Sequence, residues 1–288
     1  MIGSVDGIVS AIANGKTAQS PWNKQTGAAA YTAGRWYNTF TLGGSPSLGA
    51  YSGTSLAAQA LTDASAGAMY HGGNVSTDVK HLLSMEAMTA VATGVPAYLM
   101  LVDLLLYYPG INMNTGSAQT LTNATTLPRY TSGAGVMGFL EIVTSSGATA
   151  HNVALSYTNS GSTSGRALGQ TVACTASAIT PHITHSGLAA NNFGPFLPLA
   201  AGDVGIKSVQ SLTLSAASLA GTAALVLCKP LAQIPITTVS VASGRDLLFN
   251  MPSLPQIQDG ACLSYLLFTG GAVGASTNFY GNHQFVWG

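Results

Sequence analysis

The chain has 288 residues, of which 47% are hydrophobic and only 6% are charged, with nine basic and nine acidic side chains. Ordinary soluble domains carry about 25% charged residues. The absence of a basic stripe argues against direct nucleic-acid binding, and the low charge favours a subunit whose surface is covered by neighbours. A Ser/Thr/Gly-rich secreted β protein with an uncharged polar surface is the alternative.

Cysteine usage and the longest apolar run set the cellular context. Cys174, Cys228 and Cys262 are widely separated and lie among apolar residues, which is typical of buried free thiols in a reducing cytoplasm. Residues 95–108 are too few to cross a bilayer and include Asp103. No targeting segment is evident, and we expect neither a membrane partner nor a cofactor.

The first fourteen residues have the pattern of a short amphipathic helix. Ile2, Val5, Ile8, Val9 and Ile12 recur at helical spacing. Ser4 is a suitable N-cap and Gly15 a suitable terminator for this helix. The segment therefore predicts a helix over 2–14 whose apolar face needs a partner surface.

Residues 16–75 show little periodicity but contain regularly spaced aromatic residues. Disordered linkers have few aromatic residues, so this stretch predicts an extended arm that docks on the body or on a neighbouring subunit. We expect its aromatic side chains to anchor an interface, because Trp and Tyr dominate binding hot spots. The anchors in this arm are Trp22, Trp36, Tyr37, Phe40 and Tyr51. Removal of residues 1–40 should then leave a soluble body that no longer assembles.

A second helix is predicted over 77–91, with Ser76 as its cap and with Gly94 and Pro96 ending it. The first domain would then cover residues 1–94, comprising the N-terminal helix, the arm and this second helix. Residues 95–288 would form the body.

Residues 95–288 have the pattern of short strands separated by Gly-, Asn- and Pro-containing turns. We therefore expect a mainly β fold, a jelly-roll-like β-sandwich with an N-terminal arm and one or two short helices. An immunoglobulin-like sandwich is the alternative. The expected strands are 97–107, 135–143, 152–158, 171–179, 205–214, 222–229, 236–241, 246–250, 261–268 and 279–286.

The C-terminal strand alternates in a way that places Phe279, Gly281, His283, Phe285 and Trp287 on one face. It is interpreted as the last strand of the sandwich, and the alternative is strand addition to a neighbouring subunit. Phe285 and Trp287 are further candidate interface anchors.

Candidate chemistry is sparse. His182 and His185 are weak candidates for metal ligands, but no Asp, Glu or Cys lies near them in sequence to complete a site. Asp103 and Glu141 lie in apolar strands, where a carboxylate is either catalytic or paired with a cation such as Arg129 or Arg245. Pairing is the favoured interpretation. No nucleophile, nucleotide or zinc-protease motif is present, so we expect no catalytic residues and no enzyme.

The segments GKTAQSPWNKQTGAAAYTAGRWYNTFTLGGSPSLGAYSGT and NFYGNHQFVWG, with the charge-poor β body between them, resemble virion structural proteins of tailed bacteriophages. The resemblance is to capsid decoration or minor capsid subunits. It implies a virion protein made in the host cytoplasm, with copies of itself, as a trimer, and the major capsid protein or other virion subunits as partners.

Two other functions remain open from the sequence. One is a tail or baseplate subunit, or the jelly-roll major capsid protein itself. The other is a carbohydrate-binding or carbohydrate-cleaving β-sandwich, although nine acidic residues leave few for a sugar-binding cleft.

Overall fold

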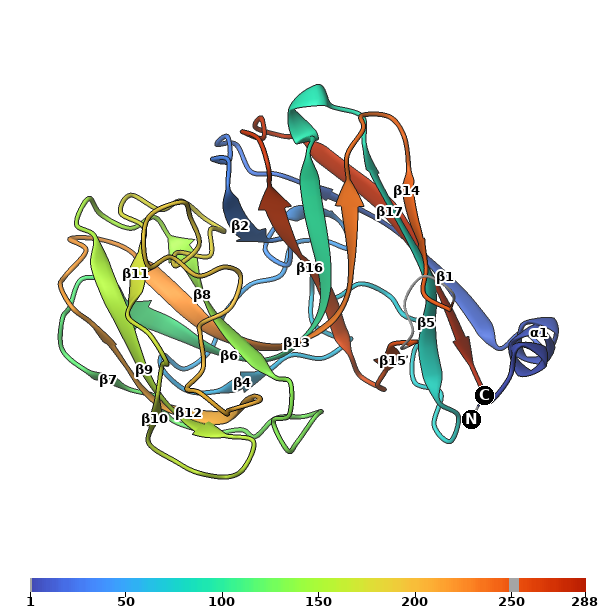
Figure 1. Cartoon of the computed structure of the whole chain (residues 1–288), viewed down its shortest axis with the longest axis horizontal. Helices are drawn as coiled ribbons and strands as arrows, with labels where there is room; N and C mark the ends of the chain where they lie inside the picture. Colours follow the sequence, from blue (N-terminus) through green and yellow to red (C-terminus); the bar gives the residue numbers. More distant parts are fainter. Residues whose placement is uncertain (1, 249–253) are drawn as a thin grey trace.

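Three antiparallel sheets account for most of the chain, which a computed structural model describes over residues 2–248 and 254–288 (Figure 1). The terminal sheet contains strands from both ends of the chain, in the order β14-β5-β17-β1-β3, with β15 also paired to β5. Its strands are β1 (Thr17–Gln25), β3 (Gly43–Ser45), β5 (Lys80–Thr89), β14 (Ser243–Asp246), β15 (Gln256–Ile257) and β17 (Asn278–Trp287).

The middle sheet has the order β2-β16-β6-β13-β8, with β4 also paired to β6. Its strands are β2 (Arg35–Asn38), β4 (Gln59–Ala60), β6 (Ala97–Asn112), β8 (Met137–Thr144), β13 (Thr222–Ile236) and β16 (Cys262–Thr269). The distal sheet has the order β10-β9-β12-β7, with β11 also paired to β9. Its strands are β7 (Gln119–Thr120), β9 (His151–Asn159), β10 (Arg166–Ala167), β11 (Val172–Cys174) and β12 (Ile206–Leu214).

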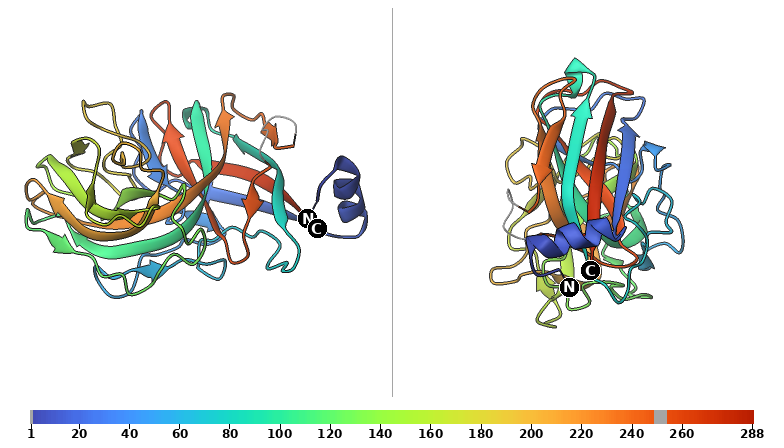
Figure 2. Two further views of the ribbon diagram at one scale, coloured as in Figure 1. Left: turned by 60° about the horizontal axis from the view of Figure 1, so that its bottom comes forward. Right: turned by 90° about the vertical axis from the view of Figure 1, so that its right-hand side faces the viewer.

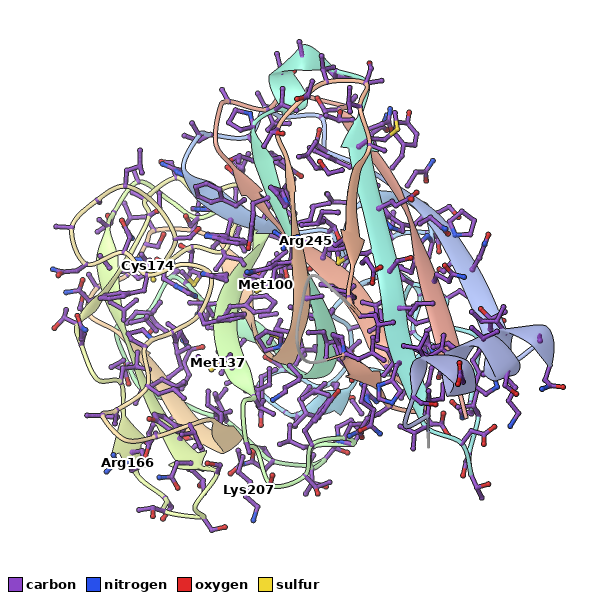
Figure 3. All side chains as sticks on the ribbon, turned by 45° about the vertical axis from the view of Figure 1, so that its right-hand side comes forward. Met100, Met137, Arg166, Cys174, Lys207 and Arg245 are labelled. Carbon is purple, nitrogen blue, oxygen red and sulfur yellow. The ribbon has the colours of Figure 1, made fainter. Side chains whose placement is uncertain are left out.

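Two long strands join the halves of the molecule, because β6 and β13 run through the cores beneath both outer sheets (Figure 1). On β6, Leu99 and Leu101 belong to the core beneath the terminal sheet, whereas Leu105 and Tyr108 belong to the core beneath the distal sheet. Side chains fill both spaces, and Cys174 lies inside the distal half while Arg166 and Lys207 lie at its rim (Figure 3). The result is a pair of sandwiches that share one bent middle sheet.

The mainly β sandwich and the N-terminal helix are confirmed. The α1 helix spans Val5–Ala13, and its cap Ser4 accepts a hydrogen bond from the backbone N–H of Gly7. Gly15 follows at φ +71°, in the left-handed region that ends many helices. A short 3-10 helix, η1 (Ala92–Gly94), precedes β6.

Most expected body strands form, with shifted bounds. The expected strands 222–229 and 236–241 are replaced by the longer β13, which ends at Ile236. The expected strand 171–179 shrinks to β11. The expected strand 246–250 is replaced by β14, and residues 249–250 lie outside the described residues.

The prediction of a second helix over 77–91 is wrong, because residues 80–89 form strand β5 between β17 and β14. The inward-facing residues of β5 include Lys80 and Thr89, which are polar, and a bulge lies opposite Gln284 and Phe285. The polar inward-facing residues and the bulge interrupt the two-residue alternation by which a strand is recognised in a sequence.

The expected extended arm and the boundary at residue 94 are also wrong. Strand β1 pairs with β17 over its full length, and β2 pairs with β16 in the middle sheet. Trp22 lies across Gly281 of β17, where a side-chain Cβ would meet the indole ring at 2.4 Å. Residues 17–40 are therefore part of the body, and we expect removal of residues 1–40 to unfold the chain rather than to leave a soluble core.

Candidate interaction surface and buried polar groups

Four of the seven expected interface anchors lie in the interior of this chain. Trp22, Tyr37, Phe40 and Phe285 are each at most 4% exposed. They pack against this chain's own aromatic rings, as in the Trp22–Tyr265 pair with ring centroids 4.8 Å apart. Their assignment as contacts for a neighbouring subunit is therefore wrong, because a buried side chain already has its partners.

The other three expected anchors, Trp36, Tyr51 and Trp287, are half-buried. Trp36 packs on Phe268, and Trp287 lies 6.0 Å from the buried ammonium of Lys80. The hydroxyl of Tyr51 donates a hydrogen bond to a buried carboxylate. Each of them has an intramolecular role, and their proposed contact with a neighbour stays a prediction.

Asp103 forms the buried ion pair that its apolar surroundings predict. Arg129 Nε and one terminal nitrogen donate to the two carboxylate oxygens at 2.8 and 2.7 Å. The same guanidinium donates to the carbonyls of Leu61 and Leu104, and the backbone N–H of Cys262 donates to Asp103. Burial raises the pKa of Asp103 while Arg129 opposes the rise. The pairing with Arg129 is confirmed, and it fixes β6 between its two cores.

Glu141 on β8 is fully buried, but its partners are neutral. Asn38 and Tyr51 donate to one carboxylate oxygen at 2.7 Å each, and Thr41 donates to the other at 2.9 Å. Within residues 2–248 and 254–288 no arginine or lysine pairs with it, so the expected cation partner is wrong here. Burial raises the pKa of Glu141 to about 7, although the three donors favour its ionised form.

Replacing Glu141 by Gln should remove a pH dependence of stability. Because the folded-state pKa of about 7 exceeds the ordinary value of 4.5, the contribution of Glu141 to stability is full below pH 4.5 and is lost as the pH rises through 7. This loss amounts to about 3 kcal/mol. Urea unfolding at pH 5 and pH 8 measures it in both proteins. An equal pH 5 to pH 8 difference in E141Q would contradict the assignment.

Histidines 182 and 185 are buried and lie in polar contacts of the chain itself. His182 Nε2 contacts the backbone carbonyl of Ser186 at 3.1 Å, and His185 Nδ1 contacts that of Phe193. Burial lowers their pKa values to about 3 and about 4, which keeps both rings neutral. The described residues contain no group of three or more His, Cys, Asp or Glu side chains that could hold a metal ion.

Two buried lysines have no signal in the sequence. Lys24 donates to the carbonyls of Leu42 and Pro46, and burial lowers its pKa to about 8. Lys80 lies 2.8 Å from His71 Nδ1, and burial also lowers its pKa to about 8. Both lysines hold loops against the terminal sheet, because their partners lie in the segments 42–47 and 71–73.

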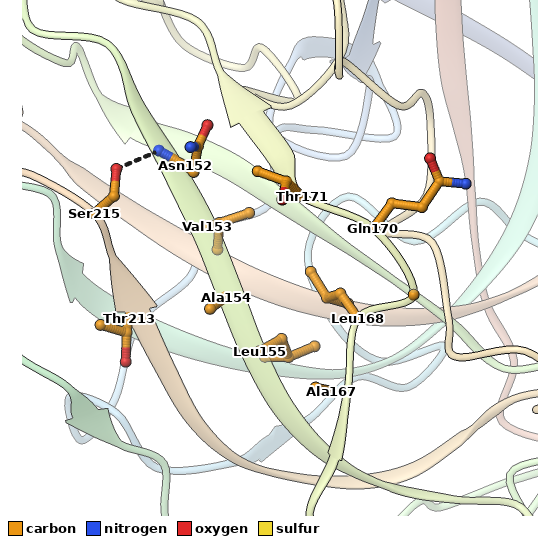
Figure 4. A pocket seen from close by; sticks show the side chains of 11 residues that line it. Asn152, Val153, Ala154, Leu155, Ala167, Leu168, Gln170, Thr171, Thr213 and Ser215 are labelled. Carbon is orange, nitrogen blue, oxygen red and sulfur yellow. Dashed lines mark hydrogen bonds between the residues drawn. The ribbon is translucent and has the colours of Figure 1, made fainter.

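A cavity of about 500 Å³ lies on the distal sheet, beside the stretch of β9 that β10 and β11 leave uncovered (Figure 4). Residues 152–155 and 167–171, with Thr213 and Ser215, form its walls. None of these side chains can ionise near neutral pH, so this cavity offers no acid or base.

The face of the terminal sheet that points away from the core is rich in amides. The strand register places its residues in rows across β14, β5, β17 and β1, such as Asp246–Ser84–Gln284–Gln19. We call it the amide face, comprising Gln19, Pro21, Asn23, Gln25, Ser84, Glu86, Met88, Gly244, Asp246, Asn278, Tyr280, Asn282 and Gln284. All of these residues are exposed or half-buried, and of the described members only Glu86 and Asp246 carry charge.

Helix α1 crosses one end of the amide face (Figure 2, right). Ile8 and Ala11 pack on Val286 of β17, with Leu83 and Leu248 beside them. The flank of the helix beside this buried side exposes an apolar stripe of Val5, Val9 and Ile12, which are 52%, 61% and 39% accessible. The apolar face of the helix is therefore wider than the part that this chain covers.

The exterior as a whole has little charge. Five of the eighteen charged side chains, Lys24, Lys80, Asp103, Arg129 and Glu141, are buried. The remaining thirteen share an accessible surface of 11011 Å². Within the described residues, no helix has the length and apolar character needed to cross a membrane.

Comparisons with known proteins give no family for this chain. No protein-family model and no curated protein matches the sequence. Among solved structures, the infectious bursal disease virus VP2 subviral particle aligns with 94% of this chain and 80% of its own, at 9% identity and a TM-score of 0.19. A likeness this weak supports no conclusion about this chain's fold or function.

Proposed function

We propose that this chain is a non-enzymatic structural subunit, which functions by packing against copies of itself and other subunits in a virion. The finer assignment is a capsid-associated decoration or minor capsid subunit of a tailed bacteriophage. The phage assignment is supported by the resemblance in the segments around Trp22–Tyr51 and Asn278–Gly288. No matched family supports it.

The observation that supports assembly most directly is the low charge of the exterior. Charged side chains normally keep a protein surface hydrated and apart from its neighbours, and this chain has thirteen on 11011 Å². Exposed apolar side chains such as Leu188, Val204 and Leu219 add to this. Burial of such a surface contributes about 25 cal/mol per Å² of apolar area, and repeated contacts multiply the effect through avidity.

Sedimentation velocity of the purified full chain, from about 1 μM to about 500 μM, tests assembly directly. We expect association that strengthens with concentration. Because the contacts are apolar and uncharged, we expect added salt to leave association intact. A monomer at every concentration, or an oligomer that dissociates in salt, would contradict the proposal.

A further inference from the structure

The amide face and helix α1 form one continuous surface at the end of the molecule (Figures 1 and 2). The side-chain amides of Gln19, Asn278, Asn282 and Gln284 make no hydrogen bond within residues 2–248 and 254–288. Asn282 Oδ1 is shielded from solvent and also lacks a partner in that part of the chain. Unused donors and acceptors beside an uncovered apolar stripe are what a partner would satisfy.

We propose that this surface is a two-fold interface with a second copy of this chain, an inference that rests on the proposed assembly function. Helix α1 covers only one end of the amide face, where Val286 and Leu83 lie. A copy related by a two-fold axis places its own helix over the open end. Each apolar stripe of Val5, Val9 and Ile12 is then enclosed between the two sheets.

A second copy fits the chemistry of the surface. In a two-fold contact the same patch meets itself, so any concentrated charge would face like charge. The half of the amide face on β17 and β1 carries no charged side chain. It consists mainly of carboxamides, namely Gln19, Asn23, Gln25, Asn278, Asn282 and Gln284. Carboxamides both donate and accept hydrogen bonds, so they can pair with their own kind. A glycan would use the amides but would leave the apolar stripe of α1 uncovered.

The area comes close to what a specific interface needs. Three strands of about nine residues and the four-residue β14, with ~4.8 Å between strands and ~3.4 Å per residue, give a footprint of ~500 Å² per copy. Two copies bury ~1,000 Å², just below the ~1,200–2,000 Å² typical of specific interfaces. The exposed side of α1 adds to this area.

Opposite charges at position 9 test the pairing. Val9 is 61% exposed, so Val9→Glu and Val9→Lys should fold like the wild type. We expect each variant alone to dimerise at least about 100-fold more weakly than wild type, because the new charge is desolvated against the partner's uncharged sheet without a counter-charge. An equimolar mixture of the two should stay as weak, because the two helices lie at opposite ends of the contact. The matched control is Leu188→Glu, at an 85% exposed site outside this surface, which should dimerise as the wild type does.

Analytical ultracentrifugation of the full-length proteins separates the outcomes. If the wild type and both Val9 variants associate equally, or if the mixture regains dimerisation, this interface is overturned and the assembly function stands. If the wild type stays monomeric, both are overturned. A monomer whose Tyr280 and Gln284 bind an immobilised glycan would reassign the amide face to carbohydrate.

Discussion

Replacing Arg129 by Met is expected to lower the free energy of unfolding by about 3–5 kcal/mol, since it leaves the carboxylate of Asp103 buried without its cation. Asp103 lies on β6 between Leu101 of one core and Leu105 of the other. The loss should therefore loosen the junction between the two sandwiches. Urea unfolding followed by tryptophan fluorescence measures the effect.

The double variant Asp103→Leu/Arg129→Met should regain much of that loss, because it removes both charges together. The carbonyls of Leu61 and Leu104 still lose their donor, so recovery should be incomplete. As a control, Asp78→Asn removes the half-exposed ion pair with Lys16 and should change stability by less than about 1 kcal/mol. A double variant as unstable as the sum of the two single variants would contradict this account.

Acid is expected to unfold this protein between about pH 5 and pH 4. Burial lowers the pKa values of His71 and His185 to about 4 and those of His182 and His283 to about 3, from an ordinary value of 6.5. The unfolded chain therefore binds more protons below pH 6.5, and stability is lost as the pH falls toward these values. Each such histidine costs about 2 kcal/mol at pH 5, against a typical total stability of about 5–15 kcal/mol.

His283→Gln isolates one of these contributions. His283 Nε2 lies 2.5 Å from the hydroxyl of Tyr265, a contact that a glutamine amide can retain. Between pH 6 and pH 4 the slope of unfolding free energy against pH should fall by about 1.4 kcal/mol per pH unit. The control is Asn114→Ala at an exposed position that carries no ionisable group, which should leave the slope unchanged. An unaltered slope in H283Q would show that protonation of His283 does not contribute to acid unfolding. Glu141 has the opposite effect, because its raised pKa makes its contribution to stability larger as the pH falls.

Local signals in the sequence were sufficient for some elements. Ser4 and the spacing of Val5, Ile8 and Ile12 define α1, because a cap and a helical period are both properties of neighbouring residues. The apolar run beginning at Ala97 predicts β6 for the same reason. The face of β17 that holds Phe279, His283 and Phe285 was also predicted from alternation, and its buried side chains confirm it.

Distant pairing explains the errors. Strands β1 and β5 both pair with β17, about 190 to 270 residues further along the chain. The apolar residues of β5 also fit a helix, and only pairing with β17 decides between the two periods. Trp22 and Phe40 are predicted at an interface but are buried in this chain. In a segment of low periodicity, an aromatic residue that packs in its own core cannot be told from one that packs on a neighbour.

The amide face was missed although half of its signal was present. Once Phe279 and His283 face inward, the alternate residues Asn278, Tyr280, Asn282 and Gln284 must face outward. Its extension by Gln19 and Asn23 depends on the register with β1, which no local pattern reveals. The apolar stripe of α1 was visible in the sequence, but which side of the helix the sheet covers was not.

Hydroxyl-radical footprinting of the wild-type chain at low and high concentration tests most directly whether the charge-poor exterior is covered by other subunits. Tyr280 and Met88 report on the amide face, and Tyr70, which is 62% exposed, reports on a site outside it. We expect Tyr280 and Met88 to lose reactivity on concentration while Tyr70 keeps it. Unchanged reactivity at every side chain up to the highest concentration would contradict assembly by this chain.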